Sequence, residues 1–271
     1  RGLGMCIRDR DQADAHRKHL EFEVESRTRA LKEANEKLTK QDAKRRQFMA
    51  DVSHELRTPL TIIRGEAQVT LRQAAASKEI YKETLETILE QAVNLSKLVD
   101  DLLLLARAEM HEFTVDLVKS DLHNLLMQNI ALWQKFTKPR ALNLEWLANN
   151  EVQVLVDKDR IAQVLTILIE NAHKYSYPET PIVLRVESEG PNINVSVIDN
   201  GDGISSSDLQ HVFERFVRLK RKGNGMGLGL SIAKAIAEAH HGTLSAYSTL
   251  GKGSQFTLTL PVLQNHTIPK D

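Results

Sequence analysis

Residues 48–60 read Phe-Met-Ala-Asp-Val-Ser-His-Glu-Leu-Arg-Thr-Pro-Leu, and they end a long stretch with coiled-coil spacing. From Asp9 to Thr58 neither glycine nor proline interrupts a helix. From Leu20 onward, a seam advances by alternating steps of four and three residues. Its positions are Val24, Arg27, Leu31, Ala34, Leu38, Gln41, Arg45, Phe48 and Val52. A seam this narrow favours a coiled coil with a second copy of the chain over a solitary amphipathic helix.

A second helical stretch, from about Lys78 to Met110, has the same spacing. Its apolar positions are Leu85, Ile88, Ala92, Leu95, Val99, Leu102 and Ala106. We expect the Ala74 to Ser77 region to form the turn of a helical hairpin. One hairpin alone would leave much apolar surface in water, whereas two hairpins bury their stripes together as a four-helix bundle. The sequence therefore predicts a homodimer.

After Met110 the pattern changes to short alternating or β-branched runs between helical windows, which is typical of an α+β domain. The expected strands are Leu142–Leu147, Val152–Val156, Pro181–Val186, Ile193–Ile198 and Gln255–Leu260. The expected helices are Asp121–Lys135, Lys158–Tyr175 and Gly229–His240. Gly242 ends the last of these, and we expect His240 and His241 to cap its carbonyls rather than to bind a ligand. The predicted fold class is multidomain: an all-α coiled coil and dimeric four-helix bundle, followed by an α+β sandwich.

Composition limits the classes of function. Basic and acidic residues number 36 each, so no overall field attracts nucleic acid, and we expect no nucleic-acid partner. Cys6 is the single cysteine, which excludes an internal disulfide and a thiolate metal cluster. No apolar stretch approaches the ~18 residues of a membrane span. Because the chain starts without methionine or a signal peptide, we expect a cytoplasmic portion whose membrane or sensory part lies upstream.

Within 48–60, His54, Glu55 and Thr58 lie within about one helical turn. A neutral imidazole can attack phosphorus, and an adjacent carboxylate can accept the second ring proton. Pro59 removes the amide that would bond the Glu55 carbonyl, so we expect the helix to bend there. A lone helical histidine is ordinarily a solvated surface residue, and only its neighbours favour a catalytic interpretation.

Four further motifs follow. Glu170-Asn-Ala-His-Lys-Tyr175 closes a helical window, and Asp199-Asn-Gly-Asp-Gly203 follows a buried-looking strand, although a simple hairpin turn would also use these glycines. Phe213-Glu-Arg-Phe216 comes next, within a basic segment. Gly223-Asn-Gly-Met-Gly-Leu-Gly229 leads into a helix whose free amides can hold phosphate oxygens. A dinucleotide fingerprint is the alternative, but it requires a preceding strand.

In this order, the motifs resemble those of the sensor histidine kinases of two-component systems. Residues 54–59 match that family's phosphoacceptor box of His, acidic residue, any two residues, Thr, Pro. The four later motifs resemble the N, G1, F and G2 boxes of its ATP-binding domain, which is of the gyrase, heat-shock, histidine-kinase and mismatch-repair type. The resemblance covers roughly residues 48–260.

The resemblance implies a role for each matched residue. His54 accepts the γ-phosphoryl group, Glu55 assists proton transfer, and Thr58 positions water for dephosphorylating the partner. The implied cofactors are ATP and Mg²⁺. Asn171 is the expected Mg²⁺ ligand, Lys174 contacts phosphate, Tyr175 covers the adenine and Asp199 accepts the adenine amino proton. Further expected ATP-binding positions are Gly201, Gly203, Arg215, Arg218, Gly225, Gly227 and Gly229. The two arginines of this set and Lys220 are expected to supply positive charge to a lid over ATP, and the alternative is that they form only a solvated face.

The resemblance also implies an organisation and a function. Residues 1–47 are a signalling coiled coil, 48–112 a dimerisation and histidine phosphotransfer hairpin, 113–262 a catalytic ATP-binding domain and 263–271 a tail. The expected enzyme phosphorylates itself on His54 and transfers the phosphoryl group to an aspartate of a response regulator receiver domain, with phosphatase activity as well. The expected setting is a membrane-anchored bacterial sensor with an upstream sensory domain.

One position departs from the family pattern. The N box ordinarily has a second asparagine four residues before Asn171, where this chain has Ile167. This places the metal coordination in doubt. Related ATPases usually need a glutamate at the same position to activate water, so Ile167 argues against efficient ATP hydrolysis. A degenerate kinase that acts only as a dimeric scaffold is the other alternative, and the intact His54, Asp199 and glycines argue against it.

Overall fold

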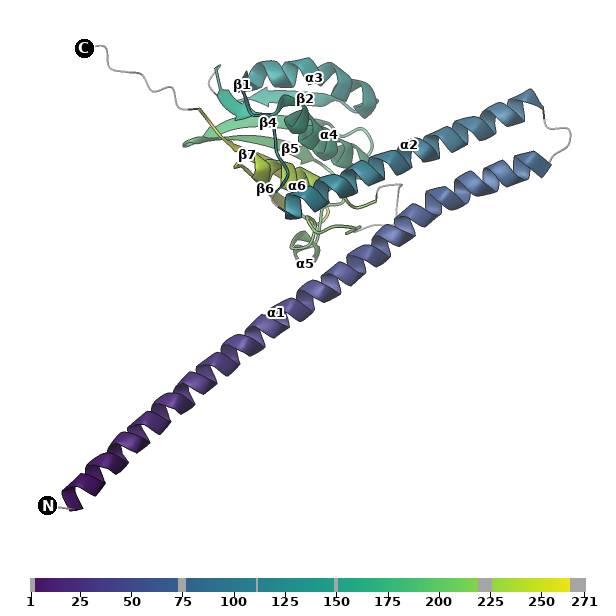
Figure 1. Ribbon diagram of the computed structural model, residues 1–271. Coiled ribbons are helices and arrows are strands. Elements are labelled where there is room, and N and C mark those ends of the chain that lie inside the picture. The colour runs from purple at the N-terminus through teal and green to yellow at the C-terminus, as the bar shows by residue number, and fades with distance from the viewer. Residues whose placement is uncertain (1–2, 73–76, 111, 149–150, 219–225, 264–271) are drawn as a thin grey trace, which may run out of the picture. The chain divides into compact units, whose positions relative to one another are not determined.

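The computed structural model describes residues 3–72, 77–110, 112–148, 151–218 and 226–263, and its ribbon is shown in Figure 1. It divides into two compact units, residues 1–55 and 56–271. No helix in these described ranges is long and apolar enough to cross a membrane. The α+β character of the second half and the helical character of the first are as the sequence predicted.

Helix α1, Leu3–Arg72, continues through Pro59. Its N-terminal part presents the predicted seam, and Val24, Leu31 and Leu38 on that seam are 62–72% exposed in the single chain. Apolar side chains repeated at this spacing gain stability when a partner helix covers them. Their exposure is consistent with the predicted coiled coil.

Helix α2, Lys78–Glu109, begins at the Ser77 cap, whose hydroxyl accepts a hydrogen bond from the Ile80 amide. The other residues of the predicted turn lie outside the described ranges. Near the hairpin end, the Thr70 and Thr84 hydroxyls are buried against each other at 2.9 Å, linking α1 to α2. The remaining surface of α2 keeps a row of exposed apolar side chains: Leu85, Leu89, Val93, Val99 and Leu103.

The described residues of the second half of the chain form two sheets. The small sheet pairs β1, Val118–Asp121, with β3, Gln153–Val156. The large sheet has the order β2-β4-β5-β7-β6. Its strands are Leu142–Trp146, Ile182–Glu189, Asn192–Asp199, Gly253–Pro261 and Thr243–Thr249 in that order. β2 runs parallel to β4, and the other pairs are antiparallel.

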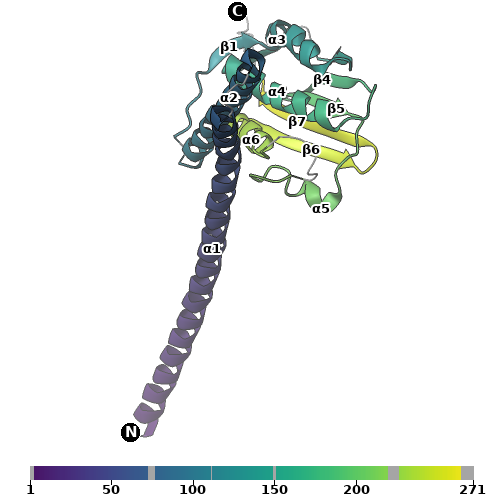
Figure 2. The ribbon, with the colours of Figure 1, turned by 90° about the vertical axis from the view of Figure 1, so that its right-hand side faces the viewer.

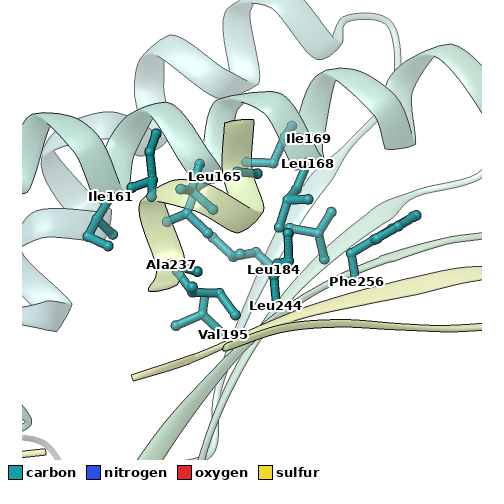
Figure 3. Packing of buried hydrophobic residues seen from close by; sticks show 14 of the residues in the cluster. Ile161, Leu165, Leu168, Ile169, Leu184, Val195, Ala237, Leu244 and Phe256 are labelled. Atoms are coloured by element: carbon teal, nitrogen blue, oxygen red, sulfur yellow. The ribbon is translucent and has the colours of Figure 1, made fainter. Parts of the chain in front are cut away.

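Helices α4, Lys158–Tyr175, and α6, Gly229–Ala239, cover one face of the large sheet, and α3, Leu122–Thr137, packs beside α4 (Figure 2). α4 begins at Asp157 and α3 at Asp121, whose carboxylates accept amide hydrogen bonds of the first turn. The buried positions of α4 are spaced by three and four residues: Ile161, Val164, Leu165, Leu168, Ile169 and Ala172. Figure 3 shows this stripe packed against strand side chains and Ala237 of α6.

Most predicted elements are confirmed, with small shifts at their ends, but three elements within the described ranges were missed. Strands β1 and β6 and the short helix α5, Ser206–Leu209, had no sequence prediction. β1 has only four residues, and one of them is buried, so it offers no clear alternation. The residues of β6 alternate between exposed and less exposed positions, but one of the two faces of the strand is polar, as is common for the edge strand of a sheet.

His240 links the end of α6 to the start of α4. Its side chain is buried, its Nδ1 donates to the Ile236 carbonyl at 2.7 Å, and its Nε2 accepts the Asp157 amide at 3.0 Å. The predicted capping role at the end of α6 is therefore confirmed for His240. Its ring also accepts a hydrogen bond from the residue that caps the start of α4. Burial lowers the pKa of His240, so the ring stays neutral and keeps its acceptor nitrogen.

We expect His240→Phe to lower the free energy of unfolding by about 2 kcal/mol, because the Asp157 amide loses its partner and the Ile236 carbonyl keeps only the bond from the His240 backbone amide. Chemical denaturation measures this change. The matched control is His241→Asn, since His241 is exposed and asparagine tolerates its positive φ of 56°. Equal losses in the two variants would contradict the assigned role of His240.

The same bond predicts a pH dependence. A lowered folded-state pKa means that the unfolded chain binds the proton more readily, so the contribution is full above the ordinary value of 6.5 and is lost as the pH falls. His173 also has a lowered pKa and adds to the same slope. The Asp101 and Asp199 carboxyls, whose pKa values are raised to about 6, act in the opposite direction over the same range. We therefore expect the free energy of unfolding to change less unfavourably from about pH 7 to about pH 5.5 in His240→Phe than in the parent, as measured by denaturation at each pH.

Candidate nucleotide site

A cavity of about 440 Å³ opens in the second unit beside α4. Helix α4 lines it with a second stripe that has the same three and four spacing as its buried stripe: Gln163, Thr166, Ile167, Glu170, Asn171 and Lys174. The end of β5, the start of α6 and Ser254 and Phe256 of β7 supply further walls. Packing of the apolar stripe against the sheet therefore turns the polar stripe toward the cavity.

Asp199 lies at the end of β5 and lines the cavity, yet its residue surface is only 5% exposed. Burial raises the pKa of its carboxyl to about 6, although hydrogen bonds from the Ser254 amide, the Gly201 amide and the Ser254 hydroxyl oppose that rise. Ser254 is the direct cross-strand partner of Asp199. The result is a fixed, buried acceptor that carries its charge only above about pH 6.

The turn after Asp199 depends on two glycines. A Cβ on Gly201 would lie 2.1 Å from the Tyr175 carbonyl oxygen, and one on Gly203 would lie 2.1 Å from the Thr249 carbonyl oxygen. Gly203 also has a φ of +66°, which L side chains rarely adopt. The sequence left a simple hairpin turn open for this motif. The structure shows instead a turn held tightly against the end of α4 and the end of β6.

Asn171, Lys174 and Tyr175 gather at the C-terminal end of α4. All three line the cavity, and the Lys174 ammonium lies 5.2 Å from the centre of the Tyr175 ring. The amide of Asn171 and the exposed carboxylate of Glu170 are oxygen donors of the kind Mg²⁺ prefers. The donor chemistry here therefore fits a magnesium ion. Ile167 lies in the same stripe, and its side chain contributes no donor.

The F and G2 motifs meet in the structure, because the Phe216 amide donates to the Gly227 carbonyl at 3.0 Å. Arg218, Gly227 and Gly229 line the cavity. Arg215 is not among its lining residues. Its guanidinium lies 2.9 Å from Glu109 and donates to the Leu105 carbonyl, both of α2.

Of the other expected ATP-binding positions, Gly203 lines the cavity. Gly201 is outside the lining but lies against the carbonyl of Tyr175, which does line it. Gly225 and Lys220 lie outside the described residues.

The residues of the phosphoacceptor motif are on α1. The His54 side chain is 76% exposed, and its Nδ1 lies 3.7 Å from the nearer oxygen of Glu55. This is longer than a hydrogen bond, but it places the carboxylate on the Nδ1 side of the ring. Thr58 is exposed, one helical turn after His54. Most of the imidazole surface is therefore exposed, and the Glu55 carboxylate lies on its Nδ1 side.

Sequence reasoning missed two polar residues that build this site. Ser254 meets Asp199 only through the pairing of β5 with β7, 55 positions apart by their numbers. Arg140, in the connection between α3 and β2, donates to the chain around the end of α4. Neither residue lies in a motif, so no local signal marked it.

Two domain families match the chain. Residues 44–111 match the His Kinase A (phospho-acceptor) domain, and residues 156–264 match the histidine kinase-, DNA gyrase B- and HSP90-like ATPase. The chain belongs to the sensor histidine kinase family of two-component systems. Within this histidine kinase, the first match contains His54, and the second contains most of the residues that line the cavity, while Asn94, Lys97 and Asp101 of α2 lie in the first.

Relatives of known family agree. The sensor histidine kinase YkoH of Bacillus subtilis is 39% identical over 224 residues, which is 79% of this chain and 47% of YkoH. Sensor histidine kinase WalK of the same organism is 36% identical over 82% of this chain and 37% of WalK. The chain therefore spans less than half the length of these relatives.

Solved structures show the same fold. Acinetobacter baumannii histidine kinase AdeS has a TM-score of 0.64 and 27% identity over 78% of this chain and 98% of AdeS. Full-length ShkA in complex with AMPPNP has a TM-score of 0.60 and 26% identity over 80% of this chain and 46% of ShkA.

We expect Gly203→Ala to destabilise the histidine kinase domain by about 3 kcal/mol or more, since it adds a backbone clash to an unfavourable φ. The matched control is Gly190→Ala, because Gly190 has a similar φ of +59° but nothing within 4 Å of the added Cβ. This control is expected to lose only about 1–2 kcal/mol. Urea denaturation of both variants measures the difference, and similar losses would mean that the turn yields to the clash.

Proposed function

We propose that this chain is the ATP-dependent catalytic portion of a sensor histidine kinase and that it phosphorylates itself on His54. The observation that carries the proposal is the buried carboxylate of Asp199 in the cavity beside Asn171, Lys174 and Tyr175. A buried acceptor beside an amide, an ammonium and an aromatic ring suits a ligand that combines a base bearing an amino group, phosphates and a cation. The related ShkA structure is a complex with AMPPNP, which is an analogue of such a ligand.

In the proposed binding mode, Asp199 accepts a hydrogen bond from the adenine amino group, and the Tyr175 ring covers the base. The Lys174 ammonium and the backbone at Gly227 and Gly229 face the phosphates, with Arg218 as a lid cation from the F motif. Bound Mg²⁺ supplies charge neutralisation at the phosphates. Asn171 is its proposed protein ligand, and the absence of a donor at Ile167 leaves the remaining positions to water and nucleotide oxygens.

In the proposed reaction, the Nε2 lone pair of His54 attacks the γ-phosphorus of ATP. The bond from that phosphorus to the β,γ-bridging oxygen breaks, and ADP leaves with the electron pair. As positive charge develops on the ring, Glu55 takes the Nδ1 proton, which is the side on which the carboxylate lies. The product is a neutral phosphoimidazole and ADP.

The proposal extends to the partners. The exposed apolar rows of α1 and α2 support a homodimer. Phospho-His54 then donates its phosphoryl group to an aspartate of a response regulator receiver domain, and Thr58 positions water for the opposing phosphatase reaction. The upstream sensory domain and membrane anchor are part of this proposal for the full-length protein.

We expect His54→Ala to abolish incorporation of label from γ-labelled ATP while leaving ADP affinity unchanged, because the acceptor ring takes no part in holding the nucleotide. Label in the parent is expected to be acid-labile and alkali-stable, as phosphohistidine is. His211→Ala is the matched control, because His211 is another exposed histidine beside a glutamate, 3.5 Å from Glu214. Parental labelling in His54→Ala, or loss of labelling in His211→Ala, would refute the assignment.

Asp199→Asn is expected to weaken ADP binding by about 1.5–3 kcal/mol, since the charge-assisted acceptor is lost. Calorimetry measures this, with Asp208→Asn outside the cavity as the control.

A pH series tests the same carboxylate. Because the Asp199 pKa is raised to about 6, the parent should lose affinity as the pH falls through that value, when the carboxylate takes up its proton. Asp199→Asn should depend less steeply on pH over that range, and the remaining slope comes from Asp101, which also lines the cavity and has a pKa raised to about 6, and from the terminal phosphate of ADP. An unchanged affinity in the variant would show that Asp199 serves only the turn.

A further inference from the structure

The end of α4 carries three of the residues that line the cavity. Asn171, Lys174 and Tyr175 lie in the last turn of this helix or next to it, where backbone carbonyls lack partners within the helix. Such ends fray unless other groups hold them. The nucleotide site therefore needs something that fixes the last turn of α4 relative to Asp199.

Arg140 contacts this end of the helix from the connection between α3 and β2. Its guanidinium donates to the carbonyls of His173 and Ser176, the second at 2.9 Å, and its Nε lies 3.3 Å from the Tyr177 carbonyl. One of its terminal nitrogens is also 3.2 Å from Nδ1 of His173. A planar fork with five N–H groups can serve several carbonyls at once, which a lysine ammonium cannot do with the same geometry.

The segment that Arg140 holds is paired on its other side with the turn after Asp199. Ser176 forms a β-bridge with Gly201, and the Tyr177 amide donates to the Asn200 carbonyl at 2.9 Å. Gly201 approaches the Tyr175 carbonyl so closely that no side chain fits between them. Residues 173–177 therefore lie between the guanidinium and the Asp199 turn.

The Arg140 backbone is itself anchored. Its amide donates to the Thr137 carbonyl at 2.9 Å, and Thr137 is a fully buried residue at the end of α3. The His173 ring lies between the two, since it is hydrogen-bonded to the Thr137 backbone and faces Arg140. The guanidinium thus connects α3, through a fixed loop, to the residues that face the cavity.

We propose that Arg140 is a positioning residue for the nucleotide: its guanidinium fixes the last turn of α4, and so sets Asn171, Lys174 and Tyr175 at the distance from Asp199 that an adenine nucleotide requires. Arg140 does not line the cavity and touches no ligand in this role. The inference rests on the proposed nucleotide site and deepens it. It assigns nucleotide affinity in part to a residue outside every motif.

The test compares Arg140→Gln with the parent and with Arg185→Gln. Arg185 is the matched control, because it is another half-buried arginine of the same domain, 2.8 Å from Glu145, and lies outside the cavity. Three quantities are measured in each: ADP affinity by calorimetry, KM and kcat for ATP in autophosphorylation, and thermal unfolding without ligand.

We expect Arg140→Gln to bind ADP about tenfold more weakly and to raise KM for ATP by a similar factor, the scale of one charge-assisted hydrogen bond. The change in kcat should be smaller, because the acceptor histidine is not displaced. Arg185→Gln should keep parental ADP affinity even where its unfolding temperature falls as much. Arg140→Lys should recover only part of the affinity.

Parental ADP affinity in Arg140→Gln overturns the proposal, as does a loss of affinity in Arg185→Gln that follows its loss of stability to the same degree. If Arg140→Gln does not fold, Arg140→Lys decides, and full affinity in it refutes the need for a fork of donors. If the parent itself fails to bind ADP, the proposed nucleotide site is wrong, and that outcome refutes the proposed function on which the role of Arg140 rests.

Discussion

The packing of α4 on the five-stranded sheet is the constraint on which the nucleotide site depends. Two stripes with the same spacing run along this helix, one apolar and buried, the other facing the cavity. Each buried Leu or Ile contributes about 1.5–3 kcal/mol relative to exposure, so the sheet fixes the rotation of the helix strongly. Once that rotation is fixed, Asn171 and Lys174 face the cavity, and no further interaction of their side chains is needed to orient them toward it. The site is therefore positioned by the core.

Hydrogen bonds across the layer then set the finer distances. Ser254 donates hydrogen bonds to the Asp199 carboxylate, and His240 bonds the end of α6 to the start of α4. Gly201, which has no side chain, leaves room for the Tyr175 carbonyl beside this turn. Arg140 completes this set at the opposite end of α4. Hydrophobic packing has no direction, whereas these bonds do, and a ligand that must be contacted at both its base and its phosphates needs both kinds of constraint.

Much of this was predictable because the signals were local. The helix of residues 158–175 was predicted with its observed ends, since Asp157 caps it and its apolar spacing is regular. The motifs around Asn171, Asp199 and Gly227 contain several of the residues that line the cavity, whereas the lining residues of α2 and β7 were not predicted. The F motif was less informative: Arg218 lines the cavity, while Arg215 contacts α2, because adjacent charges in an irregular segment leave side-chain direction undetermined. β1 and β6 were missed because short or edge strands have weak alternation.

The sequence by itself determined the family, the two kinds of fold and the histidine with its neighbouring glutamate, because each is written in residues close together along the chain. Only the tertiary structure decided that Asp199 is buried against Ser254, that the helix face shared by Ile167 and Asn171 lines the cavity, and that Arg140 holds the end of α4. Each of these depends on strand register, helix rotation or a loop returning to a distant helix. Such relations arise from burial of the whole core, and no stretch of a few residues contains them.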